Sequence, residues 1–132
     1  DGGQWPSTSN YLGGANAGPL RTYDAGEAVE FAVQITAHHR GHFELHVCEE
    51  HIGPLTPDPE GPSGCLSKWQ LERVTPEELG IIDCKANDSR GDCQPLDSDY
   101  PNRWYLSPAV GVKKMTFRIP EGLQCESCTL QW

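Results

Sequence analysis

The stretch that decides the fold is Ala28-Val29-Glu30-Phe31-Ala32-Val33-Gln34-Ile35-Thr36. Its larger apolar residues recur at every second position, so an extended chain places Val29, Phe31, Val33 and Ile35 on one face. The opposite face then carries small and polar side chains. This alternation predicts a β-strand with one face turned toward a core.

The same alternation recurs beyond this stretch. Phe43, Leu45 and Val47 follow the segment 38–41 and predict a second strand, joined to the first as a hairpin or a corner. Later strands are expected at 103–106, 112–119 and 128–132. Within the strand 112–119, Thr116 and Arg118 should face outward.

Three of these segments share the apolar face that a core needs. The residues expected to pack against one another on facing sheets are Phe31, Val33, Phe43, Leu45, Met115 and Phe117, with Ile119 continuing the inward face of its strand. A sandwich of two antiparallel sheets can bury all of them.

The connections between the strands are long. Residues 49–64 contain four prolines and must form a loop, and 83–103 form a second, polar loop. Thr75-Pro76-Glu77-Glu78 is a helix start with a capping-box pattern, and Gly80 ends that helix almost at once. We therefore expect an all-β fold, an immunoglobulin- or fibronectin-like antiparallel β-sandwich with long disulfide-pinned loops and at most one short helix. Residues 1–132 should form this single domain.

The charge of the chain argues against two classes of partner. Nineteen acidic and ten basic residues give a net charge of -9. Phosphate backbones and anionic membrane surfaces repel such a chain, so we expect no nucleic-acid and no membrane partner. The sequence holds no apolar run near the roughly 18 residues of a membrane span. It shows no signal peptide, so an export signal would have been removed or would lie outside these residues.

Six cysteines in a small acidic domain indicate an oxidising compartment, and we expect a secreted, extracellular protein. Chain order favours pairing Cys48 with Cys65, Cys84 with Cys93, and Cys125 with Cys128. The alternative of a zinc site at Cys125 and Cys128 lacks the second cysteine pair that such sites usually have. Asn87-Asp88-Ser89 is an N-glycosylation sequon, which agrees with secretion.

Two long segments carry a family pattern. The first is Ile35-Thr36-Ala37-His38-His39-Arg40-Gly41-His42-Phe43-Glu44-Leu45, and the second is Ile119-Pro120-Glu121-Gly122-Leu123-Gln124-Cys125-Glu126-Ser127-Cys128-Thr129-Leu130-Gln131-Trp132. They resemble segments of lytic polysaccharide monooxygenases, in particular the family-15 auxiliary-activity enzymes and their chitin-binding type-4 relatives. The first is similar to I/L-T-A-N-H-x-G-x-F-E and the second to C-x-x-C-x-L-Q-W. A weaker match covers Asp1, Gly13-Gly14 and Tyr23.

The resemblance implies copper held in a histidine brace, built from the amine and side chain of a first-residue His and from one internal His, with an axial Tyr or Phe. His39 matches the internal histidine and is the candidate metal ligand; His38 takes the Asn-like position before it and is the candidate supporting residue. The first-residue His has no match in this chain, which begins with Asp1, and the chain stops at Trp132, before the axial aromatic. The chain as it stands is therefore expected not to be a competent monooxygenase.

The other histidines allow a simpler interpretation. His42, Glu44 and His46 share one face of the expected strand 41–48, opposite Phe43. Strand rise separates His42 from His46 by about 13 Å, too far to share an ion. Solvated histidines on an outward face are therefore favoured over a metal site.

Three further residue groups have alternative interpretations. The acidic loop residues Asp83, Asp88, Asp92, Asp97 and Asp99 lack the spacing of a calcium loop, which favours a solvated loop. Arg90-Gly91-Asp92 is a weak adhesion motif. The aromatic candidates for stacking on sugar rings are Trp5, Tyr11, Trp69, Tyr100, Trp104 and Tyr105, although most tryptophans in a domain of this size belong to the core.

Two functions follow from these features. The first is a non-catalytic extracellular module with a structural (fibre- or matrix-forming) or glycan-binding role, in which open strand edges allow self-association into an oligomer or filament. The alternative is the central part of an active copper-dependent monooxygenase that oxidatively cleaves chitin, cellulose or a related glycan. Polysaccharide is the expected partner in both, and copper the expected cofactor only where the full brace exists.

Overall fold

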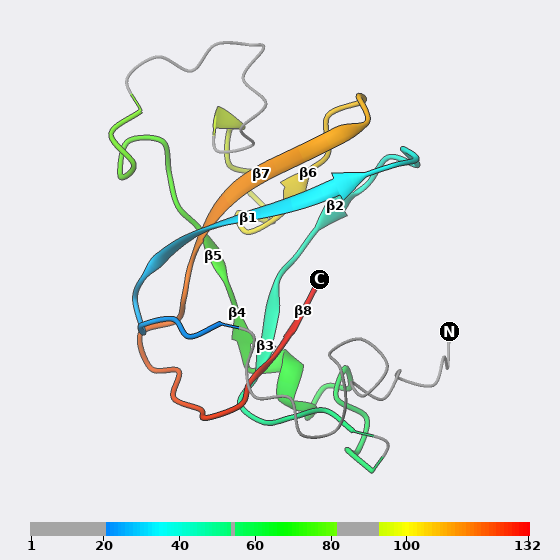
Figure 1. The fold of residues 1–132 in the computed structure, drawn as a ribbon, viewed down its shortest axis with the longest axis vertical. Coiled ribbons are helices and arrows are strands. Elements are labelled where there is room, and N and C mark those ends of the chain that lie inside the picture. Colours follow the sequence, from blue (N-terminus) through cyan, green and yellow to red (C-terminus); the bar gives the residue numbers. More distant parts are fainter. Residues whose placement is uncertain (1–20, 54, 82–92) are drawn as a thin grey trace.

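The computed structural model describes residues 21–53, 55–81 and 93–132, and its regular elements are nearly all strands (Figure 1). In chain order these are β1 (Ala28–Ile35), β2 (His42–Phe43), β3 (His46–Cys48), the 3₁₀ helix η2 (Cys65–Ser67), β4 (Trp69–Gln70), β5 (Glu72–Arg73), β6 (Trp104–Tyr105), β7 (Gly111–Arg118) and β8 (Thr129–Gln131). The expected all-β antiparallel sandwich is confirmed. No helix within the described ranges is long and apolar enough to cross a bilayer.

The strands form three small antiparallel sheets. The first has the order β1-β7-β5, the second pairs β2 with β6, and the third has the order β4-β3-β8. β1 and β7 pair along eight residues each, from Ala28 opposite Arg118 to Ile35 opposite Gly111. In Figure 1 these two strands lie side by side across the upper half of the molecule, and β3, β4 and β8 lie together below them.

The chain turns a corner after β1 instead of forming a hairpin. β1 pairs with β7, whereas β2 pairs with β6 through His42 opposite Tyr105 and Phe43 opposite Trp104. The segment between β1 and β2 therefore carries the chain from one sheet to another. The short strands β4 and β5 carry too little alternation to be recognised in the sequence; β5 pairs with β7 on the side opposite β1.

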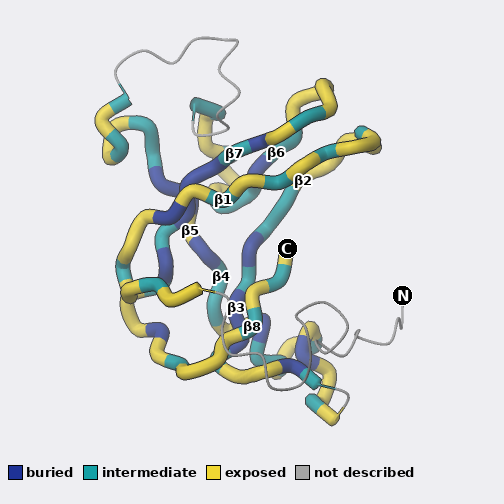
Figure 2. The backbone as a smooth tube through the Cα atoms, in the orientation of Figure 1, coloured by how far each residue is buried: buried dark blue, intermediate teal, exposed yellow. Residues whose placement is uncertain are grey.

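The core is centred on β7, with buried segments on β3, β5 and β7 (Figure 2). Met115 and Phe117 of β7 are fully buried and Leu45 nearly so, as expected. Phe31, Val33 and Phe43 are only half-buried and pack against this cluster from its rim. The other buried members are Val29, Val47, Leu71, Trp104, Ile119 and Leu123. Phe31 and Val33 lie toward the middle and end of β1, an outer strand of this sheet, whereas β7 lies between two strands.

Two local expectations have different outcomes. Thr116 was expected to face outward but is buried, and the buried Val74 donates its backbone N–H to the Thr116 carbonyl at 3.1 Å as the chain leaves β5. The capping box at Thr75 and Glu78 is present, since Thr75 N–H donates to Glu78 Oε2 at 3.0 Å and Glu78 N–H to Thr75 Oγ1 at 3.3 Å. Gly80, at φ 68°, closes this single turn without a longer helix.

Disulfides pin the loops that flank the sheets. Cys48 bonds Cys65 and Cys125 bonds Cys128. Cys93 is also disulfide-bonded, while its expected partner Cys84 lies outside the described residues. Because the sulfurs of Cys125 and Cys128 are bonded to each other, they are not available as zinc ligands.

Truncating the buried ring at the centre of β7 tests this core. We expect Phe117→Ala to lower the free energy of unfolding by about 3–5 kcal/mol, the usual cost of emptying a fully packed aromatic site. Val112→Ala, on the same strand but 51% exposed, should cost under about 0.5 kcal/mol. Urea denaturation of both variants measures the two free energies of unfolding. Comparable losses of stability in the two variants would mean that Phe117 is not at the centre of the core.

Candidate functional site

The corner between β1 and β2 presents the candidate ligand His39 to solvent. β1 ends at Ile35 and β2 begins at His42, and His39 is exposed between them. The turn is made by two residues with positive φ, Arg40 at 63° and Gly41 at 113°. Glycine tolerates this region, whereas arginine adopts it only when its surroundings hold it there.

The corner is also tied to the segment that follows β6. Leu106 donates its backbone N–H to the Gly41 carbonyl at 3.1 Å, and Ile35 pairs with Gly111 at the start of β7. In Figure 1 the β1–β2 corner and the turn leading into β7 project from the same side of the molecule. His39 is therefore carried on a loop whose base is fixed by two strand pairs.

His38, the neighbour expected to support His39, is half-buried and bonds to the backbone. Its Nδ1 accepts the N–H of Arg40 at 3.1 Å. A ring nitrogen that accepts an N–H has no proton, so the proton of the neutral imidazole sits on Nε2. Nε2 is buried and has no hydrogen-bond partner among the residues that the structure describes. His38 thus has neither ring nitrogen open to a metal, and His39 remains the candidate ligand of the pair.

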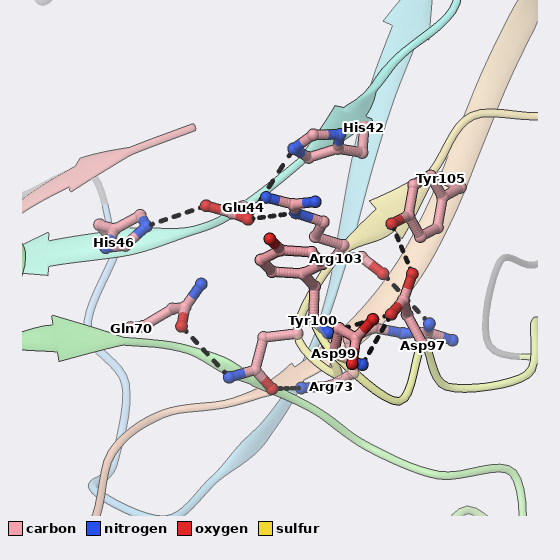
Figure 3. A network of polar contacts seen from close by, with 11 residues as sticks. His42, Glu44, His46, Gln70, Arg73, Asp97, Asp99, Tyr100, Arg103 and Tyr105 are labelled. Carbon is pink, nitrogen blue, oxygen red and sulfur yellow. Dashed lines mark hydrogen bonds and ion pairs between the residues drawn. The ribbon is translucent and has the colours of Figure 1, made fainter.

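The expected single strand 41–48 is two short strands, β2 with His42 and β3 with His46, and both histidines contact Glu44 as well as solvent. Glu44 lies between them, with His42 Nε2 3.8 Å from Oε1 and His46 Nε2 3.7 Å from Oε2 (Figure 3). His46 Nδ1 also lies 3.0 Å from the Leu66 carbonyl oxygen. The His42 ring meets the edge of Tyr105 at 5.6 Å between centroids. The i, i+2, i+4 spacing predicted that these side chains share one face. Their contacts with Leu66 and Tyr105 could not be predicted from that spacing, because they join distant parts of the chain.

Arg103 is the residue that sequence reasoning missed in this network. Its Nε donates to Glu44 Oε1 at 2.6 Å, and its guanidinium carbon lies 3.4 Å from the centroid of the Tyr100 ring (Figure 3). The hydrogen bond from Arg103 holds the pKa of Glu44 below its ordinary value, and the nearby positive charge acts in the same direction. The same bond raises the pKa of Arg103. No sequence signal links Glu44 to Arg103, which are 59 positions apart.

A second set of bonds fixes the chain around β6. Tyr105 donates its hydroxyl to Asp97 Oδ2 at 2.7 Å, which lowers the pKa of Asp97 and raises that of Tyr105. Asp97 Oδ1 also accepts the backbone N–H groups of Asp99 and Tyr100. These bonds make Asp97 part of a turn, and its carboxylate is already satisfied without calcium.

A buried arginine joins β5 to this same segment. Arg73 donates to the carbonyls of Arg103 at 3.2 Å and Gln94 at 2.9 Å, and its Nε lies 3.1 Å from the sulfur of Met115. The Gln94 amide bonds the backbone of Tyr105 on both sides, accepting its N–H and donating to its carbonyl. The loop that carries Arg103 is therefore held against the core by polar bonds as well as by packing.

The aromatic candidates for sugar stacking are not equivalent. Trp104 is 2% exposed and belongs to the core, where it packs against Phe43 and Phe117, so of the two interpretations the core one holds for it. Tyr100 is 50% exposed, but Arg103 covers one face of its ring. Trp69 and Tyr105 are half-buried. Trp5, Tyr11, Asn87, Asp83, Asp88 and Arg90-Gly91-Asp92 lie outside the described residues.

The donor chemistry of this corner fits copper in kind, but one ligand does not complete a site. An imidazole such as that of His39 suits copper. Across the described ranges, the one group of three potential metal ligands is Cys48, Glu50 and Cys65, and its two sulfurs form a disulfide. The chain has five histidines, all between positions 38 and 51, so residues 1–37 offer no second imidazole. The residues present therefore do not form a full copper brace.

Comparison with known proteins places the chain in a family. The profile of the family described as lytic polysaccharide mono-oxygenase, cellulose-degrading, matches residues 2–132. The chain belongs to this family.

A solved structure shares the fold. It is a lytic polysaccharide monooxygenase of family AA15 from Thermobia domestica in the Cu(I) state, with a TM-score of 0.55 and 20% sequence identity. The match covers 83% of this chain and 43% of that one, so the chain spans less than half the length of that structure. A search of curated proteins gave no match.

The ion pair at the centre of the network makes stability depend on pH. Because the folded-state pKa of Glu44 is depressed, its stabilising contribution is present above its ordinary value near 4.5 and is lost as the pH falls through the folded pKa. We expect Glu44→Gln to cost about 1 kcal/mol at pH 7, because a charged hydrogen bond is lost while the site stays partly solvated. The difference in the free energy of unfolding between Glu44→Gln and the unmodified protein should narrow toward pH 3.

Urea denaturation at both pH values measures this difference. Glu126→Gln, at an exposed position, is the matched control and should show little change at either pH. A Glu44→Gln effect that is the same at pH 7 and pH 3 would mean that the ionised carboxylate does not stabilise the fold.

Proposed function

We propose that this chain forms the β-sandwich of a secreted protein that acts on a polysaccharide, and that His39 is the copper ligand it contributes. The observation that carries the proposal is the placement of His39. It is exposed on a corner whose backbone is fixed by a hydrogen bond from each side, within the segment 35–45 that resembles the family's metal-binding motif. A rigid, solvent-facing imidazole is what a surface metal site requires of its scaffold.

The roles of the chain's own residues follow from this geometry. His39 offers one imidazole nitrogen at the surface, and the bond between Leu106 and Gly41 keeps the corner in place. Copper bound there would supply the oxidising chemistry that breaks a glycan chain. Residues 1–132 supply no further imidazole for such a brace outside positions 38–51, so the chain itself contributes the fold, the corner and the histidine.

A second candidate function is supported by the ligand count. The described residues give His39 no companion ligands, which favours a non-catalytic module with a glycan-binding or structural, fibre- or matrix-forming role. In the part of the chain described, β8 is an outer strand of its sheet, and Leu130 and the neighbouring Trp132 are exposed. Such an edge can pair with another copy of the chain, which is a route to a filament.

Copper binding distinguishes the two functions. For the 132-residue chain we expect no nanomolar Cu(II) site by isothermal titration calorimetry, because one imidazole leaves the other equatorial positions without ligands. His39→Ala should therefore change little in this chain. A nanomolar site that His39→Ala abolishes would show that these residues alone complete the brace.

The natural mature protein decides the catalytic question. N-terminal sequencing that finds a first-residue His, together with tight Cu(II) binding lost in His39→Ala and kept in the control His51→Ala, would support the monooxygenase. Tight binding unaffected by His39→Ala would overturn the assignment of His39. A mature protein without such a site would favour the non-catalytic module.

Binding to the glycan itself gives a test that does not need copper. The protein should sediment with chitin or cellulose particles and remain in solution without them. Recovery of all the protein in the supernatant with both polymers would contradict a glycan-associated role.

A further inference from the structure

The turn that carries His39 is held by the side chain of its own neighbour. Arg40 has φ 63°, a conformation that a non-glycine residue keeps only when other contacts determine it. The contact seen here is the hydrogen bond from the Arg40 N–H to His38 Nδ1, at 3.1 Å. This hydrogen bond links the residues on either side of His39, so the His39 backbone is part of a small hydrogen-bonded ring.

Two hydrogen bonds hold the corner, and each fixes a different part of it. The bond from Leu106 to the Gly41 carbonyl attaches the corner to the rest of the sandwich. The bond between His38 and Arg40 lies on the other side of the turn and fixes the two peptide groups that flank His39. The direction of the His39 Cα–Cβ bond, and hence of its imidazole, depends on those two peptide groups.

We propose that His38 is a positioning residue, whose ring nitrogen Nδ1 sets the orientation in which His39 faces solvent. This inference deepens the proposed function, because the orientation of His39 matters only if His39 binds a metal. Nδ1 of His38 is occupied by the Arg40 N–H, and in the neutral imidazole the proton is then on the buried Nε2. Neither ring nitrogen of His38 can therefore bind a metal, and that role is left to His39.

The chemistry of the contact says which side chains can replace His38. An asparagine places its Oδ1 where the His Nδ1 lies and accepts the N–H two residues further on, in an Asx turn. A glutamine carries its oxygen one bond further out, and an alanine has no acceptor. His38→Asn should therefore retain the turn, whereas His38→Gln and His38→Ala should lose it.

Amide exchange of the protein, measured by NMR, tests the turn without copper. We expect His38→Ala to raise the exchange rate of the Arg40 amide by about tenfold, since one hydrogen bond is lost. His38→Gln should behave in the same way, and His38→Asn should restore the protection. The Met115 amide in β7 should be unchanged in all three, which separates a local effect from general destabilisation.

The side chain of His39 supplies the second readout. Its Cβ order parameter should fall in His38→Ala and recover in His38→Asn. An unchanged Arg40 exchange rate, or an unchanged His39 order parameter in His38→Ala, would overturn the inference. So would a failure of His38→Asn to rescue either one.

Copper affinity separates this inference from the proposed function. In a natural mature protein with a tight site, His38→Ala should weaken Cu(II) binding about tenfold while His38→Asn stays near the unmodified protein. Equal affinities in all three would overturn the positioning role. If the mature protein binds no copper but Arg40 and His39 respond as expected, the copper function fails and the role of His38 in the turn stands.

Discussion

The antiparallel pairing of β1 with β7 is the constraint on which the other contacts depend. Eight residues of each strand are in register, and β5 pairs with the other side of β7. The register turns Met115 and Phe117 inward together and sets Ile35 opposite Gly111. A shift by one residue would turn both side chains outward, because side chains alternate in a strand. The start of the corner at Ile35 is thereby fixed by the same pairing that buries the core.

The histidine corner depends on the chain leaving this sheet. Since β2 pairs with β6 and not with β1, residues 36–41 bridge two sheets and cannot make regular strand bonds. Their polar groups find other partners: Arg40 N–H bonds the ring of His38, and the Gly41 carbonyl accepts from Leu106. A loop satisfied in this way keeps one geometry while leaving the imidazole of His39 exposed. The corner therefore combines an exposed imidazole with a backbone held by hydrogen bonds.

Below the corner, a polar network takes the place that apolar packing has elsewhere. Glu44 lies between two histidines and bonds Arg103, and Arg73 bonds the carbonyl of that same arginine from the core side. These bonds tie the strands after the corner to the segment around β6. Charged groups that are partly solvated stabilise less than the same area of buried side chains. The network therefore orients the segments, while the core around Phe117 supplies most of the stability.

The sequence by itself determined the strands with strong alternation, the antiparallel all-β class, the capping box at Thr75 and Glu78, and the family segment that contains His39. These features are local, because period-two patterning and capping involve residues a few positions apart. Only the tertiary structure decided that β1 meets β7, that Trp104 is buried, that Thr116 is covered, and that Arg103 reaches Glu44. Each of these joins residues far apart in the chain, and a pattern within one segment carries no information about its partner. Two of the two-residue strands, β4 and β5, went unpredicted because they are too short to show a period; they form by pairing with β3 and β7.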